Sequence, residues 1–475
     1  MINLTDRLRA ATVEGILADS DQIEYIDRSG NTTNVKAILD GIDSKLNIIL
    51  DRMDLESTFA YGVQWDKTAT SPDCTRVGNM LLHNILPIQS QMRGCLLDDD
   101  GHVIKYLPDS GWTEETLDGS AGQVMVEIPK FYWKFTESGN TQTVMLSQVA
   151  IDGYKKVEKS YVSAYEATID RQDANKLKLA SVKSDETRYR GCNNVAANDE
   201  TFKTGLRRAA TNLSLTNART YARNRKDNSY NWNVYCYQQH KAIWWLFVVE
   251  YATRYTQKSV NNNTTVSGYK QGGLGNGVAT VNDAAWNGFN GRYPFVPIGV
   301  TDGLGNGSGE VEYVLYSGDN ATWATVMVPR YRGIENPFGH IFKTLDGIKI
   351  MVESGETGSS KVYICNNFSL WNDRNDTEGY IYICDEDRTQ GWVKEVFFGE
   401  NGDIIAKTVG GGSSQYYTDQ HYCNVSSSGL RAFRVGGHSA TGTYAGLVYS
   451  HSNSTPSTAS TTSGFRLCFI PDETL

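Results

Sequence analysis

The hydrophobic positions near the start of the chain follow a heptad pattern. Apolar side chains recur at alternating intervals of four and three residues over 35–53, with mainly polar residues between them. Thr33 and Asn34 precede the pattern and are residue types that cap helices. The sequence therefore predicts a coiled-coil-like helix over 33–56. Its apolar positions are Val35, Leu39, Ile42, Leu46, Ile49 and Met53.

A coiled coil of fewer than three heptads needs help from another domain to stay associated. We therefore expect residues 1–58 to form an N-terminal attachment and oligomerisation segment, in which the larger domain supports the pairing of the helix. An amphipathic helix that packs on its own domain would show the same pattern, so this alternative stays open.

From Phe59 onward, most apolar positions lie in short β-branched or aromatic runs that turn residues separate. Two segments, 213–225 and 238–255, have helical spacing instead, and the second is so apolar that we expect Trp244 and Trp245 in the core. The expected strands lie at 122–135, 153–167, 311–315, 324–328, 348–353, 361–365, 380–384 and 392–398.

Two long irregular stretches interrupt this pattern. The pentapeptide GLGNG occurs at 273–277 and again at 303–307, and neither copy continues as a phosphate-binding loop would. We expect turns with positive φ there. Residues 410–463 are rich in Ser, Thr, Gly, Tyr and Asn, but the apolar sequence GFRLCFI follows at 464–470. This order predicts a surface loop system that a final core strand holds in place.

The composition excludes several classes of protein. The chain has 475 residues, of which 40% are apolar, so it can bury a sizeable core. It has neither an apolar run of about 18 residues nor a secretory signal, so we expect no membrane insertion. Its net charge of −9 argues against binding to nucleic acid. The eight cysteines form no CxxC pair, and we expect buried thiols rather than a zinc site.

Several motifs, taken in order, resemble the formylglycine-generating-enzyme-type branch of the C-type lectin fold. The resemblance implies an α+β fold in which residues 156–475 form a C-type-lectin-like ligand-binding domain. Residues 59–155 are then either a separate β-rich domain or an extension of the lectin-like body. The motifs are YVSAYEAT at 161–168, TNLSLTNARTYARNR at 211–225, EYATR at 250–254, NPFGHIFKTLDGI at 336–348, LRAFRVGGH at 430–438 and GFRLC at 464–468.

The enzymes of that family hold copper with a pair of cysteines shortly before the closing Gly-Phe-Arg. Here residues 441–461 contain no cysteine, so we expect neither the oxidase activity nor a cofactor. Trp371, Asn372 and Asp373 resemble one half of a lectin calcium site, but the second half is missing, and the metal content stays open. No motif of a nucleophilic or zinc enzyme occurs, so we expect no catalytic residues.

The chain also resembles tail-fibre and receptor-binding proteins of phages, notably those whose C-terminal segment a retroelement diversifies. The motifs that carry this resemblance are YGVQWD at 61–66, TRVGN at 75–79, PIQSQMRGCLLDDDG at 87–101 and QVMVEIPKFYWKF at 123–135. In such proteins the variable positions lie just before the final Gly-Phe-Arg. The resemblance therefore implies a ligand-binding face made by His438, Ser439, Thr441, Thr443, Tyr444, Tyr449, His451 and Asn453.

The composition of residues 436–463 supports a binding face independently of the family. Tyr offers a large rigid contact area at low entropic cost, and Ser, Thr, Gly and Asn offer adaptable hydrogen bonds. The alternative is a solvated Ser/Thr loop without a binding role.

We therefore expect a phage tail-fibre or receptor-binding subunit that is made in the host cytoplasm and located in the virion tail. Its expected partners are a host cell-surface receptor, either glycan or protein, two further copies in a homotrimer, and a tail or baseplate protein bound through the N-terminus. Two alternatives stay open, a glycan-degrading tail enzyme and a bacterial surface adhesin with the same lectin-like end.

Overall fold

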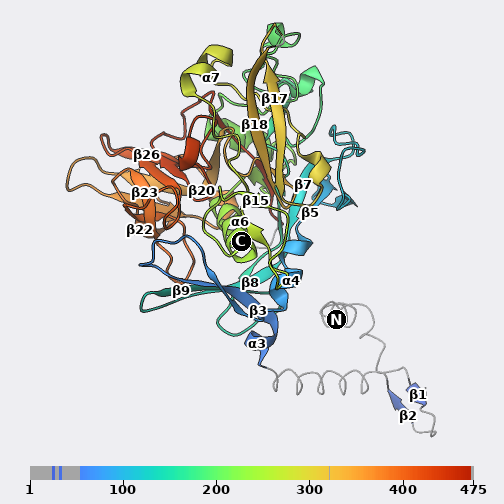
Figure 1. The fold of residues 1–475 in the computed structure, drawn as a ribbon. Coiled ribbons are helices and arrows are strands. Elements are labelled where there is room, and N and C mark those ends of the chain that lie inside the picture. Colours follow the sequence, from blue (N-terminus) through green and yellow to red (C-terminus); the bar gives the residue numbers. More distant parts are fainter. Residues whose placement is uncertain (1–23, 27–31, 35–53, 320, 472–475) are drawn as a thin grey trace. The chain divides into compact units, whose positions relative to one another are not determined.

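The computed structural model describes most of the chain (Figure 1), which divides into two units. The first unit is Met1–Phe59 and the second is Ala60–Leu475. In the first unit, β1 (Glu24–Ile26) pairs antiparallel with β2 (Thr32–Asn34). The residues that the structure describes are 24–26, 32–34, 54–319 and 321–471.

The predicted heptad helix over 33–56 does not begin where the sequence places it. Thr33 lies within β2 and pairs with Tyr25, so a residue expected at a helix cap is extended instead. The six heptad positions lie outside the described residues. The next described element is a single short helix, α3 (Leu55–Phe59).

The predicted α+β class, a C-type-lectin-like domain behind a coiled-coil-like helix, is wrong. Strands account for 33% of the structure and helical segments for 14%, and one sheet curls into a half-barrel. Five helices occur within the described ranges. The physical reason is that short polar segments such as Ser450–Ser452 pair with distant strands, so more of the chain is extended than its apolar runs indicate.

A six-stranded sheet joins the beginning and the end of the second unit. β11 (Ser160–Ser163) pairs antiparallel with β7 (Gln123–Ile128) and with β29 (Leu467–Phe469). The closing Gly-Phe-Arg segment thus leads into the core beside β11, which comes far earlier in the chain. The strand order is β14 (Trp232–Val234), β29, β11, β7, β5 (Arg93–Leu97) and β6 (Val103–Tyr106).

A five-stranded sheet contributes aromatic side chains to the same core. Phe131, Trp133 and Phe135 alternate with more exposed residues along one strand, as expected for a sheet with one buried face. The strand order is β10 (Lys155–Val157), β8 (Phe131–Ser138), β9 (Thr141–Ser147), β3 (Ala60–Asp66) and β4 (Thr75–Gly78).

The largest sheet has nine strands, and its inner face packs Leu345, Val393 and Phe433 into the main core. Its order is β22 (Ile381–Asp385), β21 (Ser360–Ile364), β20 (Phe342–Val352), β26 (Gly429–Val435), β27 (Ser450–Ser452), β25 (Gln420–Cys423), β23 (Gly391–Val396) and β24 (Ala406–Val409), with β28 (Ser463–Gly464) parallel to β20.

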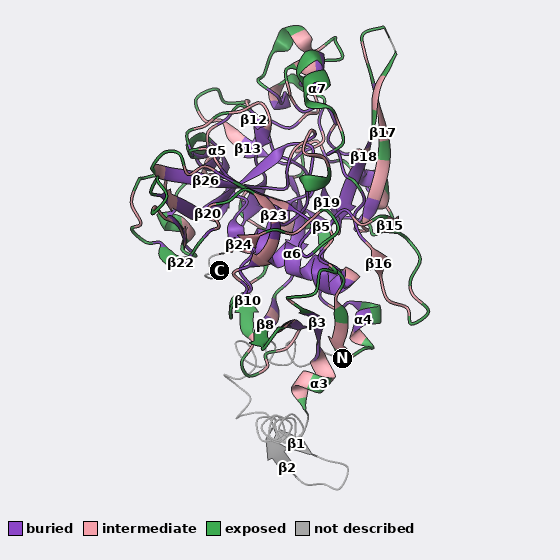
Figure 2. Cartoon of the chain, turned by 60° about the vertical axis from the view of Figure 1, so that its left-hand side comes forward, coloured by how far each residue is buried: buried purple, intermediate pink, exposed green. Residues whose placement is uncertain are grey.

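One helix, α6 (Tyr237–Tyr251), lies in the interior of the second unit (Figure 2). Thirteen of its 15 residues are buried, which explains why its sequence is apolar on all sides. Trp244 and Trp245 are fully buried, as predicted, and the ring of Trp245 stacks on Trp65 at 5.9 Å. The helix ends where Ala252 adopts a left-handed conformation.

The remaining elements are short and lie around these sheets. The predicted helix over 213–225 is confirmed as α5, which begins after Ser214 because the Ser214 hydroxyl accepts a hydrogen bond from the Asn217 amide. The elements are α4 (Leu82–Ile85), α5 (Leu215–Arg223), α7 (Asp283–Asn290), β12 (Thr168–Asp170), β13 (Lys178–Ala180), β15 (Val260–Asn261), β16 (Gln271–Gly272), β17 (Gly309–Tyr316), β18 (Thr322–Tyr331) and β19 (Ile334–Glu335).

Two local predictions are confirmed, the turns at the GLGNG copies and the buried thiols. Both GLGNG copies contain glycines with positive φ, including Gly275 at 73° and Gly305 at 56°. At Gly305 a side chain would also collide with the backbone, because a Cβ there would lie 2.2 Å from the Asp109 carbonyl oxygen. All eight cysteines are free thiols, and all except Cys74 are buried. Within the described residues, no helix is both long and apolar enough to cross a bilayer.

Candidate functional site

The predicted ligand-binding residues lie between β26 and β28, on two loops and on β27. Phe433 and Val435 of β26 point into the core. Because successive side chains of a strand alternate between faces, Arg434 lies on the opposite, outer face. His451 of β27 pairs directly with Arg434 and lies on that same outer face.

A row of side chains crosses this outer face. Strand register places His451 between Arg434 on one side and Tyr422 of β25 on the other. Trp392 of β23 pairs with Gln420, which is two residues before Tyr422 and so points to the same face. Four strands, β23, β25, β26 and β27, therefore contribute to one surface.

Three of the eight predicted residues gather around one buried ring, that of Phe342 at the start of β20. The centroid of this ring lies 4.6 Å from that of His438, 5.0 Å from that of His451 and 5.9 Å from that of Tyr449. The buried ring of Trp286 in α7 also packs against His438, with the ring centroids 5.5 Å apart. Phe342 thus supports the base of the predicted face.

Two aromatic pairs reach solvent beside this base. Tyr422 is 38% exposed and stacks on His451, with the rings 5.3 Å apart and almost parallel. Tyr444 is 45% exposed and packs edge-to-face against the half-buried Trp392 at 5.0 Å. Thr443, next to Tyr444, is exposed as well. We call Trp392, Tyr422, Thr443, Tyr444 and His451 the aromatic face.

The other predicted residues lie beneath or beside the aromatic face. Ser439 is fully buried, and its hydroxyl donates a hydrogen bond to the His340 carbonyl at 2.8 Å. The Thr441 hydroxyl accepts a hydrogen bond from the His438 amide at 2.8 Å, which closes a tight turn. Asn453 is half-buried and lines a separate cavity of about 320 Å³.

The histidines of this region are neutral at physiological pH. Burial lowers the pKa of His438 to about 4, and its Nδ1 accepts a hydrogen bond from the Ala440 amide. Burial and the charge of Arg434 together lower the pKa of His451 to about 3. Tyr422 therefore stacks on a neutral imidazole, which suits contact with a sugar ring or an apolar side chain.

The sequence alone identified neither Tyr422 nor Trp392 as part of the site. Both belong to strands that lie before β26 in the chain, and they reach the face only through long-range pairing with β27 and β25. The sequence offered one signal for such residues. Tyr422 is an aromatic residue in the short, mainly polar segment QHYC, where no apolar alternation explains its presence.

In the motif that resembles half of a calcium site, the side-chain oxygens bind basic side chains of the same protein. The Asp373 carboxylate accepts a hydrogen bond from Arg219 at 2.7 Å, and the Asn372 side-chain oxygen accepts one from Lys349 at 2.8 Å. Trp371 is buried and donates its indole N–H to a backbone carbonyl. These contacts give the segment a structural role.

A second acidic group lies on the turn that contains Gly101. Asp98, Asp100 and His102 bring their ligand atoms within 4.8 Å of one another. Gly101 has a φ of 88°, and Asp100 forms an ion pair with Lys226. The charge on this turn is already partly balanced by the protein.

Comparison with known proteins provides no relative from which to assign this surface. No family model matches the chain, and a search of curated proteins returned no match.

Proposed function

We propose that this chain is a receptor-binding protein of a phage tail, which attaches the virion to a bacterial surface receptor through the aromatic face. The observation that carries the proposal is the exposed ring of Tyr422 stacked on the buried His451, with Tyr444 and Trp392 on the same side of the sheet. Exposed aromatic side chains on a rigid support are typical of recognition surfaces.

The sheet supports recognition in a second way, because it fixes these side chains before a receptor binds. Phe342 and Ser439 anchor the loops from below, so ordering the face on binding costs little entropy. Thr443 and Tyr444 lie on a loop and are both exposed. Unlike the strand residues, they can therefore be substituted without loss of core contacts.

The proposal includes a homotrimer in which residues 1–58 attach the protein to a tail or baseplate protein. Three faces on one fibre would bind a cell surface together, because a tethered second site experiences an effective concentration in the millimolar range. Weak single sites on either a glycan or a protein receptor would then suffice for firm attachment.

Combining Tyr422→Ala with Tyr444→Ala should reduce virion adsorption to host cells by at least about tenfold. Truncation of two exposed aromatic contact residues commonly costs more than about 1.4 kcal/mol of binding free energy, which corresponds to that factor. The measurement is the adsorption rate of virions that carry the variant, compared with wild type at equal particle number.

Tyr316→Ala is the matched control, because Tyr316 is also exposed, at 54%, but lies on the β17–β18 hairpin. It should adsorb like wild type. Thermal unfolding of the purified variants must show that both remain folded. Normal adsorption by the folded double variant would mean that the receptor binds elsewhere.

A further inference from the structure

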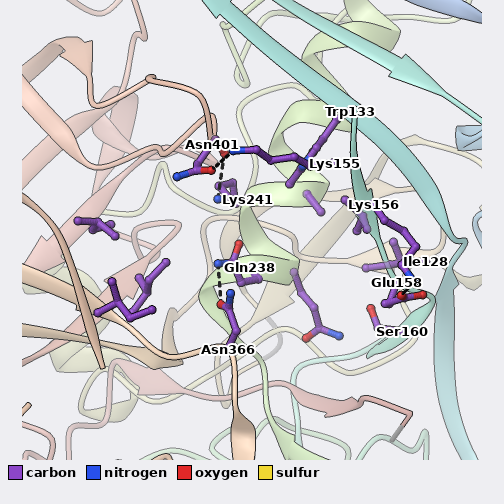
Figure 3. Close-up of a pocket in the computed structure, with 16 residues that line it drawn as sticks. Ile128, Trp133, Lys155, Lys156, Glu158, Ser160, Gln238, Lys241, Asn366 and Asn401 are labelled. Carbon is purple, nitrogen blue, oxygen red and sulfur yellow. Dashed lines mark hydrogen bonds and ion pairs between the residues drawn. The ribbon is translucent and has the colours of Figure 1, made fainter. Parts of the chain in front are cut away.

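A second site lies away from the aromatic face, where two sheet edges approach the first turn of α6. β10 is the edge strand of the five-stranded sheet, and β22 is an edge strand of the nine-stranded sheet. Between them lies a cavity of about 320 Å³ (Figure 3). This volume is at the small end of ligand-binding cavities, so it fits a small molecule or a single unit of a polymer.

Apolar side chains from both sheets line the cavity. Trp133 of β8 and Ile364 and Ile383 of the nine-stranded sheet line it, and Ile381, which is 71% exposed, lies at its rim. A pyranose ring carries C–H groups that pack well against aromatic and aliphatic side chains of this kind.

Another part of the lining presents paired amides. The Gln238 side-chain amide donates to the Asn366 side-chain oxygen at 2.9 Å, and Figure 3 shows the two side chains facing one another at one end of the cavity. Within the described chain, the side-chain oxygen of Gln238 and the side-chain NH₂ group of Asn366 form no hydrogen bond. An acceptor beside a donor matches adjacent hydroxyl groups, each of which both donates and accepts.

The other end of the cavity carries an unneutralised positive charge. Lys241 forms an ion pair with Asp403, and Lys156 forms one with Glu158. Lys155 instead donates to the Asn401 side-chain oxygen at 2.6 Å and to a backbone carbonyl at 3.2 Å. No described carboxylate pairs with it, and its ammonium keeps a third donor for a ligand.

The cavity continues toward a second one of about 520 Å³, with which it shares Asn401, Ile381 and Ile383. A ligand unit in the first cavity can therefore extend along β22 into the second. This continuity favours one residue of a chain over a free metabolite.

We propose that the cavity binds an acidic sugar residue of a polysaccharide. The sugar carboxylate lies against Lys155 and Asn401, and the sugar hydroxyls form hydrogen bonds with Gln238 and Asn366. The sugar ring packs on Ile364 and Ile383. This site does not depend on the aromatic face, so each can fail without the other.

The test is titration of the full chain with sodium D-glucuronate and, separately, with D-glucose, followed by NMR or calorimetry. Glucuronate should bind at least about tenfold more tightly than glucose, because a charge-assisted hydrogen bond to Lys155 is available only to the acid. Lys155→Gln should remove most of this preference, and Asn366→Ala should weaken both sugars.

Lys159→Gln is the charge-matched control, since Lys159 is exposed on the same segment but does not line the cavity. It should leave both affinities unchanged. Lys155 and Asn366 are exposed, so their variants should fold. Equal affinity for the two sugars, or glucuronate binding that survives Lys155→Gln, would overturn the proposal. Absence of glucuronate binding would overturn it too, whatever the adsorption result for the aromatic face.

Discussion

Replacing Glu386 with Gln should stabilise the folded protein by about 4 kcal/mol at pH 8 and leave its stability almost unchanged at pH 4.5. Glu386 follows β22 and is 3% exposed, and its Oε1 accepts a hydrogen bond from the Ser452 hydroxyl at 2.6 Å. Burial raises the pKa of this carboxyl to about 8, despite the lowering effect of that hydrogen bond.

The sign follows from the folded pKa being higher than the unfolded one. The contribution of Glu386 is fully present below its ordinary pKa of about 4.5 and is lost as the pH rises through 8, because the unfolded chain gives up the proton first. Gln has the same shape and does not titrate, so the variant lacks this loss. Urea unfolding of both proteins at several pH values measures the difference.

Glu356→Gln provides the control for this experiment. Glu356 is exposed, and its replacement should give the same pH dependence as wild type. A Glu386→Gln variant whose stability stays parallel to wild type from pH 4.5 to 8 would show that burial does not raise the pKa of this carboxyl.

The long helices and apolar strands were predictable because their signals are local. Residues 238–255 contain enough apolar positions to predict α6, and Ser214 marks the start of α5. The end of α6 was missed by four residues, because a helix that is apolar on every side gives no change of pattern where Ala252 turns.

The α+β class failed for the opposite reason. β25 and β27 have the polar sequences QHYC and SHS, and they are strands only because β26 and β23 supply their partners. A polar three-residue segment has no intrinsic preference strong enough to predict a strand. Thr33 shows the same limit, since pairing with Tyr25 overrides its tendency to cap a helix.

The candidate site was predictable in part. The segment before Gly464 gave His438, Tyr449 and His451, and these side chains do meet around Phe342. Their burial was not visible in the sequence, because the depth of a residue depends on the strands beside it. The exposed part of the face needs Tyr422, and only the parallel pairing of β25 with β27 brings it there.

The largest loss of stability should follow Glu166→Gln, at about 3–5 kcal/mol. Glu166 is 4% exposed, and its carboxylate lies 2.9 Å from Lys343 Nζ and 2.6 Å from His340 Nδ1. Burial acts to raise its pKa, but Lys343 and His340 lower it to about 2, so the group is ionised at neutral pH. Gln keeps the shape and leaves Lys343, which is 1% exposed, without its counter-charge.

A double-mutant cycle with Lys343→Met separates this charge effect from a loss of packing. Each single variant should be strongly destabilised, whereas the double variant should be more stable than the sum of the two losses predicts, because no buried charge of the pair remains. Urea unfolding of wild type and the three variants at pH 7 gives the three changes in the free energy of unfolding. Additive losses would mean that Glu166 and Lys343 do not stabilise one another.

The same cycle links this buried pair to receptor binding. Lys343 also donates to the Gly339 carbonyl at 2.6 Å, and its Cδ lies 3.4 Å from where a Cβ on Gly436 would be. Gly436 begins the loop that carries His438, so the pair lies directly under the aromatic-face loops. We therefore expect the double variant to recover adsorption together with stability, since Met fills the space that the lysine stem occupies.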